Sequence, residues 1–132
     1  MTAQNDAARD LRGLRVLIVE DESLLALLLE DMLAELGCKV IGSAATVAEA
    51  IEAIARDAPE VTILDIKLGA EKSFRVAEFL SGRGLPFVFA TGYGDGQVDD
   101  PWRDREVLQK PFVQDQLADA LARALDASAP RA

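Results

Sequence analysis

Two hydrophobic patterns alternate along this chain: short continuous runs, and stretches with helical spacing. Mostly apolar runs of four residues lie at 16–19, 61–64 and 87–90, with weaker ones at 39–42 and 106–109. A continuous apolar run of this length is typical of a strand that is buried on both faces of a sheet. The pattern therefore predicts five β-strands at these ranges.

Helical spacing of apolar residues fills most of the intervals between the runs. The first helix is expected to begin near Leu24 and to stop at Gly37. The second opens with a capping box formed by Thr46 and Glu49 and continues through Ile54. These signals place one helix after each of the first two strands.

The later helices differ in strength. One is predicted from Phe74 to Gly82 or Gly84, and the last carries apolar residues at a spacing of four over 113–125. The segment 92–105 between them is rich in glycine and aspartate, and each glycine costs a helix about 1 kcal/mol relative to alanine. We therefore expect any fourth helix there to be short or frayed.

Alternation of strands and helices predicts an α/β fold, a doubly wound five-stranded parallel sheet with helices on both faces. We expect one domain over residues 13–126, with a flexible lead at 1–12 and a flexible tail at 127–132. Ligands of such sheets bind at the carboxyl ends of the strands. The residues at those ends are therefore the candidate site.

Polar residues stand at four of these strand ends. They are Glu20 and Asp21 after the first strand, Asp65 after the third, Thr91 after the fourth and Lys110 after the fifth. Three carboxylates, a hydroxyl and an ammonium would then meet in one pocket. Such a set suits Mg²⁺ binding and phosphorylation of an aspartate.

Each residue has a predicted role. Asp21 and Asp65 are expected to ligate Mg²⁺ directly, Glu20 through a water, and Lys67 through its backbone carbonyl. Asp65 is the predicted phosphoacceptor. Mg²⁺ and Lys110 would neutralise the phosphoryl oxygens, while Thr91 donates a hydrogen bond to one of them.

Simpler interpretations remain open for each residue alone. The acids at 20–22 can cap the first helix, and Asp65 can cap a turn. Thr91 can belong to a turn, and Lys110 can be solvated, although a cis bond to Pro111 would aim its ammonium inward. Only the combined order and strand placement favours the phosphorylation site.

Composition narrows the function classes. The chain has 132 residues with a net charge of −9, and an acidic surface repels nucleic-acid phosphate. No segment resembles a membrane span or a secretory signal, so we expect a cytoplasmic protein without membrane contact. The single cysteine, Cys38, is expected to be a small buried residue without a redox role.

These motifs resemble the receiver domain of bacterial two-component response regulators, over about residues 14–126. The acids after strand one, Asp65, Thr91 and Lys110-Pro111 match that family's pattern. The stretch 86–94, with Phe-Ala-Thr-Gly-Tyr, resembles the subgroup called FATGUY receivers, many of which are single-domain proteins.

The resemblance implies the flavodoxin-like receiver fold and Mg²⁺-dependent phosphoryl transfer from a histidine kinase or histidine phosphotransfer protein. This chain has no histidine, so the donor must be another molecule. The receiver would catalyse only its own phosphorylation and dephosphorylation. It would signal to a downstream protein target or act as a phosphate shuttle or sink, as a monomer or weak dimer.

Three positions depart from typical receivers. Val107 replaces the aromatic residue of strand five, so Tyr93 is a candidate switch residue, which unchanged NMR signals on phosphorylation would disprove. Gly69 replaces a proline, which predicts a more mobile loop. Lys67 places a cation where many relatives have a neutral residue, and Lys67→Asn is expected to change the dephosphorylation rate.

Two other function classes compete with this interpretation. A phosphate-independent receiver-fold binding module would usually lack one of the site residues. A haloacid-dehalogenase-type phosphatase requires a second aspartate where Lys67 stands, and a nucleotide-binding fold requires a glycine-rich turn where this chain has acids.

Overall fold

A five-stranded parallel sheet forms the centre of the protein, in the order β2-β1-β3-β6-β7. The computed structural model describes residues 10–92 and 105–128. The strands are β1 (Arg15–Val19), β2 (Lys39–Ala44), β3 (Val61–Asp65), β6 (Phe87–Thr91) and β7 (Val107–Gln109). All five lie where the apolar runs predict them, which confirms the expected α/β sheet.

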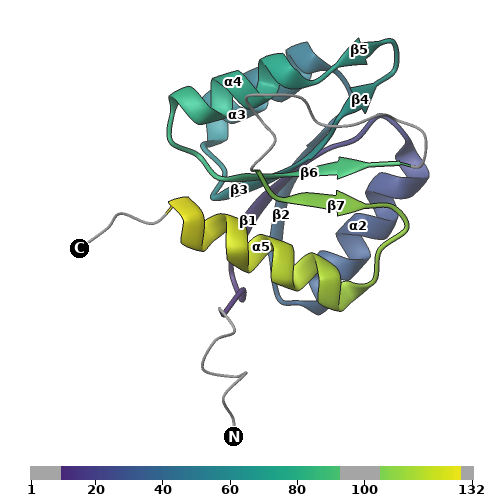
Figure 1. Ribbon diagram of the computed structural model, residues 1–132, viewed down its shortest axis with the longest axis vertical. Helices are drawn as coiled ribbons and strands as arrows, with labels where there is room; N and C mark the ends of the chain where they lie inside the picture. Colours follow the sequence, from purple (N-terminus) through teal and green to yellow (C-terminus); the bar gives the residue numbers. More distant parts are fainter. Residues whose placement is uncertain (1–9, 93–104, 129–132) are drawn as a thin grey trace, which may run out of the picture.

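Helices cover both faces of this sheet (Figure 1). Helices α3 (Val47–Asp57) and α4 (Phe74–Gly82) lie on one face, and α2 (Ser23–Glu35) and α5 (Gln114–Ser128) on the other. Alternate strand residues divide between two buried clusters: Leu17 and Leu64 pack with α3 and α4, whereas Ile18 and Ile63 pack with α2 and α5. The continuous apolar runs therefore serve two cores at once.

Helix ends follow the predicted local signals with one variation. Gly37 ends the first helix region with a φ of +85°, a conformation that favours glycine. The Thr46 side chain accepts the N–H of Glu49 at 3.1 Å, as in a capping box. The reciprocal bond goes one residue further back, because the Glu49 carboxylate accepts the N–H of Ala45.

A small hairpin between β3 and α4 was not predicted. Its antiparallel strands are β4 (Lys67–Leu68) and β5 (Glu71–Lys72), and the two-residue loop between them is Gly69-Ala70. Gly69 has a φ of +60°, whereas Ala70 has no positive φ, which fits a type II′ turn. Gly69 therefore supplies a backbone conformation that the hairpin needs.

Two predictions about helices are untested or need correction. The expected fourth helix and Tyr93 lie mostly or wholly outside the described residues. Helix α5 continues to Ser128, so residues 127 and 128 belong to the helix and not to the expected tail.

Cys38 is half-buried and not fully buried, and its burial raises the pKa of the thiol. Among the described residues, no helix is both long and apolar enough to cross a bilayer.

Candidate functional site

The carboxyl ends of β1, β3 and β7 bring three charged side chains into contact. The Lys110 ammonium donates to Oε1 of Glu20 at 2.8 Å and to Oδ2 of Asp65 at 3.3 Å. Both carboxylates are buried, and the Lys110-Pro111 peptide bond is cis. Residues 90 and 45 positions apart therefore meet where the strand order places them.

The two carboxylate oxygens of Asp65 differ in their hydrogen bonding within the described residues. Oδ2 accepts from Lys110, whereas Oδ1 is buried with no hydrogen-bond partner in the described part of the chain. Burial, followed by the charge of Glu20, raises the pKa of Asp65 to about 7. Within residues 10–92 and 105–128 this carboxylate accepts no main-chain N–H, so the cap interpretation of Asp65 finds no support there.

The ammonium of Lys110 partly neutralises the negative charge of Glu20 and Asp65. Its own burial favours the neutral amine, but the hydrogen bonds and charges of Glu20 and Asp65 outweigh burial and raise the Lys110 pKa. One ammonium thus faces two carboxylates, and Asp21 adds a third nearby. The pocket carries a surplus of negative charge that a cation would neutralise.

The three acids can also hold a metal ion. Glu20, Asp21 and Asp65 each place a carboxylate oxygen within 4.8 Å of the others. Hard oxygen donors of this kind suit Mg²⁺, which also keeps several waters. Oδ1 of Asp65 has no hydrogen-bond partner within the described residues, and since a buried carboxylate oxygen normally has one, this carboxylate has room for a further ligand.

An open hollow lies over Asp21 and Asp65. Its lining includes three acids, two lysines and two glycines: Asp21, Glu22, Leu25, Asp65, Lys67, Gly69, Gly92 and Lys110. The predicted ligand residue Lys67 therefore borders the site. The hollow opens to solvent, so a small group could reach Asp65 through it.

The helix-cap interpretation of the first acids holds only in part. Glu22 is the N-cap residue of α2 but makes no capping bond with its side chain. Oε2 of Glu20 accepts the N–H of Glu22 at 3.1 Å, while Oε1 of the same carboxylate accepts from Lys110. Glu20 thus serves both the chain turn into α2 and the charged cluster.

Thr91 ends β6, next to the site, without a bond to Asp65. Its hydroxyl donates to the carbonyl of Gly92 at 3.4 Å, and its own carbonyl accepts the Lys110 N–H at 2.8 Å. Val107, at the position of the expected aromatic residue, is 39% exposed on β7. The switch role of Thr91 therefore stays a prediction, as does that of Tyr93.

Sequence reasoning missed a contact from the hairpin to the acids. The main-chain N–H of Gly69 donates to Oδ2 of Asp21 at 2.8 Å. The sequence marks Gly69 only as a replacement for proline and predicts a mobile loop there. The structure instead anchors the turn to a candidate metal ligand.

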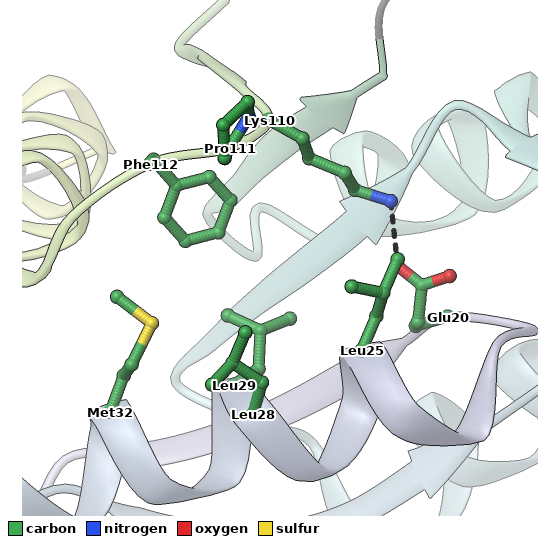
Figure 2. A pocket seen from close by; sticks show the side chains of 8 residues that line it. All are labelled: Glu20, Leu25, Leu28, Leu29, Met32, Lys110, Pro111 and Phe112. Carbon is green, nitrogen blue, oxygen red and sulfur yellow. Dashed lines mark hydrogen bonds and ion pairs between the residues drawn. The ribbon is translucent and has the colours of Figure 1, made fainter.

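An apolar pocket adjoins the charged cluster (Figure 2). Side chains of α2 form one wall and the segment after the cis bond forms the other, with Glu20 and Lys110 at one end: Leu25, Leu28, Leu29 and Met32 face Pro111 and Phe112. Further out on α2, Leu24 and Leu27 are 78% and 56% exposed. An apolar surface of this kind next to a charged cluster suits contact with another protein.

Comparison with known proteins gives a consistent result. Residues 16–122 match the profile of the response regulator receiver domain. The transcriptional regulatory protein PdtaR of Mycobacterium tuberculosis is 33% identical over 115 residues, which cover 84% of this chain and 56% of PdtaR. The chain spans about half the length of the curated relatives it matches.

Solved structures agree in fold. The solution structure of SdrG from Sphingomonas melonis Fr1 is 49% identical and has a TM-score of 0.79, covering 86% of this chain and 97% of that one. SdrG from Pseudomonas melonis Fr1 in its BeF3-activated conformation is 50% identical, with a TM-score of 0.73, covering 84% and 95%. Both likenesses extend over nearly the whole of the solved chain.

Proposed function

This chain belongs to the response regulator receiver domain family, and we propose that it accepts a phosphoryl group on Asp65 from a phosphohistidine of a partner protein. The observation that carries this proposal is the state of the Asp65 carboxylate. One oxygen is held by Lys110, and the other is buried, unpartnered within the described chain and bordered by an open hollow. A nucleophile needs one such free oxygen.

The proposed step is an in-line displacement. Oδ1 of Asp65 forms a bond to phosphorus as the bond between phosphorus and the donor imidazole nitrogen breaks, and the imidazole leaves neutral because its other ring nitrogen carries a proton. Lys110 shifts from Glu20 toward the transferred oxygens, and the Thr91 hydroxyl turns to donate to one of them. Bound Mg²⁺ would be held by Asp21, Asp65, the Lys67 carbonyl and, through water, Glu20, and would supply positive charge for the phosphoryl oxygens.

The donor is proposed to be a histidine kinase or histidine phosphotransfer protein that contacts α2. The chain has no histidine of its own. A protein that carries phosphohistidine to Asp65 must cover the rim of the hollow, and Leu25 belongs to both the hollow and the apolar pocket. Burial of the exposed leucines of α2 would contribute to its binding.

The output is proposed to pass through protein contacts. The BeF3-activated conformation of SdrG supports a phosphorylation-dependent state, since BeF3 bound to a carboxylate mimics a phosphoryl group. We propose that residues 13–126 act as the receiver, in the cytoplasm and as a monomer or weak dimer, with either a downstream protein target or a role as a phosphate shuttle or sink. Its catalysis would be limited to gain and loss of its own phosphoryl group.

Intact-mass analysis tests the proposal. The protein is incubated with acetyl phosphate and Mg²⁺, and the wild type is compared with Asp65→Asn, which keeps the size of the side chain. We expect one phosphoryl adduct on the wild type and none on the variant. Equal adducts on both would place the acceptor elsewhere. Absence of any adduct, also with a phosphorylated histidine donor, would favour the phosphate-independent binding module.

A further inference from the structure

We infer that the main-chain amide of Gly69 is a positioning group for the metal site, because it orients the carboxylate of Asp21. This inference rests on the proposed function, in which Asp21 binds Mg²⁺. The N–H of Gly69 donates to Oδ2 of Asp21 at 2.8 Å across 48 positions of sequence. The Asp21 side chain is exposed, so this bond limits the orientations that it would otherwise sample in water.

A carboxylate has two oxygens, so Asp21 can accept from Gly69 with one and face the cation with the other. One of its oxygens already lies within 4.8 Å of those of Glu20 and Asp65. Hydrogen bonds to ligating carboxylates fix their orientation, and losing such a partner typically costs about 10- to 100-fold in metal affinity. Gly69 thereby acts on the cation through Asp21 without touching it.

The turn explains why this position is glycine. Gly69 is the first loop residue of the β4–β5 hairpin and has a φ of +60°, which side-chain-bearing residues rarely adopt. Space is not the restriction, since an added Cβ would lie 4.0 Å from Oδ2 of Asp21. Proline, the residue of typical receivers here, has a φ near −65° and no N–H. It would lose both the turn and the hydrogen bond.

Two main-chain groups of the hairpin therefore act on the proposed metal site, one on the cation and one on its ligand Asp21. Lys67, on β4, offers its carbonyl to the cation under the proposed function, and Gly69, two residues later, offers its N–H to the ligand Asp21. Binding of Mg²⁺ should order the hairpin, and disturbance of the turn should weaken Mg²⁺. The hydrogen bond from Gly69 to Asp21 thus holds the turn in place, whereas the absence of proline predicts a mobile loop.

The first test uses metal-free protein and does not depend on phosphorylation. In ¹⁵N-labelled protein, Asp21→Ala should move the Gly69 amide proton upfield and speed its exchange with solvent. Glu22→Ala removes the same charge one residue later and should leave that resonance in place. An unchanged Gly69 amide in Asp21→Ala would overturn the inference.

The second test measures Mg²⁺ affinity by titration followed by NMR. Gly69→Pro should raise the Kd about tenfold, while Gly69→Ala, which keeps the N–H, should raise it less. Gly84→Pro is the matched control, because Gly84 also has a positive φ, 69°, and its N–H donates to Ser81, away from the site. It should leave the Kd unchanged.

The outcomes separate the two proposals. A wild-type protein that binds Mg²⁺ with a Kd unaffected by Gly69→Pro would overturn this inference and leave the proposed function standing. A wild-type protein that binds no Mg²⁺ would overturn the proposed metal site and the inference with it. If Gly69→Pro does not fold, Gly69→Ala and the amide signal in Asp21→Ala decide.

Discussion

Lys110 lies closer to the carboxylate of Glu20, at 2.8 Å, than to that of Asp65, at 3.3 Å. The ammonium is thus shared unequally between two buried acids, and Asp65, the proposed phosphoacceptor, is the less well neutralised of the two. A phosphoryl group on Asp65 would carry about −1.5 to −2 charges beside this ammonium, in place of the charge of the carboxylate. Several properties of the site follow from this balance of charge.

Asp65→Asn is expected to stabilise the metal-free protein, and more so at pH 8 than at pH 5. The pKa of Asp65 is raised to about 7 in the folded state from a usual 3.8. The stability that its proton provides is therefore fully present below pH 3.8 and lost as the pH rises through 7. Asparagine carries no charge at either pH, so its advantage at pH 8 should approach about 4 kcal/mol, since each pKa unit between 3.8 and 7 corresponds to about 1.4 kcal/mol.

Urea unfolding with a chelator present measures this difference in the free energy of unfolding. Saturating Mg²⁺ provides the control, because a bound cation neutralises the carboxylate and should shrink the advantage of the variant. An equal gain at pH 5 and pH 8 would contradict the raised pKa.

Lys67→Asn is expected to speed loss of the phosphoryl group. The Lys67 side chain borders the hollow over Asp65, where its ammonium can pair with phosphoryl oxygens and hinder water. An exposed ion pair is worth up to about 1 kcal/mol, which corresponds to a two- to fivefold change in rate. The lifetime of the phosphorylated form is followed by intact mass after removal of the donor.

Lys72→Asn is the matched control for this change. Lys72 faces Lys67 across the hairpin and carries the same charge, but it does not line the hollow. Its replacement should leave the lifetime nearly unchanged. Equal lifetimes for wild type and Lys67→Asn would remove any role for the Lys67 charge.

Thr62→Val is expected to stabilise the fold by about 1 kcal/mol. Thr62 lies on β3, fully buried between Leu17 and Phe87 on the neighbouring strands, and its hydroxyl has no hydrogen-bond partner within the described residues. Valine has nearly the same shape and removes the cost of burying that group. Chemical denaturation gives the change in the free energy of unfolding.

A second threonine provides the opposite case. Thr46 caps α3 through its side chain, so Thr46→Val should destabilise the protein by about 1 kcal/mol. A loss of stability in Thr62→Val as well would mean that the buried hydroxyl has a partner after all.

Leu28→Asp is expected to slow phosphorylation by a protein donor about tenfold or more while leaving phosphorylation by acetyl phosphate unchanged. Leu28 is 55% exposed on the wall of the apolar pocket, so a charge there should oppose docking more than folding. Ala55→Asp, exposed on α3 across the sheet, is the control. Transfer from any histidine kinase that phosphorylates the wild type measures the effect. A similar loss in both variants would argue against docking on α2.

The strands and most of the site were predictable because their signals are local. Buried parallel strands require continuous apolar runs, and the charged residues at the carboxyl ends of β1, β3 and β7 must meet once the strand order is known. The meeting of Glu20, Asp65 and Lys110 follows from that reasoning alone. The ligand roles and the phosphoacceptor role are chemical proposals that geometry supports without testing.

The hairpin and the Gly69 contact were not predictable for physical reasons. Strands of two residues carry too few side chains for a periodicity, and a glycine amide leaves no trace in composition. The apolar pocket beside α2 also could not be predicted from the sequence. The leucines of α2 continue the helical pattern toward solvent, and sequence alone does not separate the buried Leu29 from the exposed Leu28.

The bond between the Lys110 N–H and the Thr91 carbonyl has a consequence for how a signal leaves the pocket. This hydrogen bond links the main chain at the end of β6 to the main chain just after β7. If the end of one strand moves, the end of the other is therefore expected to move with it. This mechanical link does not depend on which side chain stands at Val107. A receiver that lacks the strand-five aromatic residue therefore keeps a backbone route from its reactive centre to the outer strand.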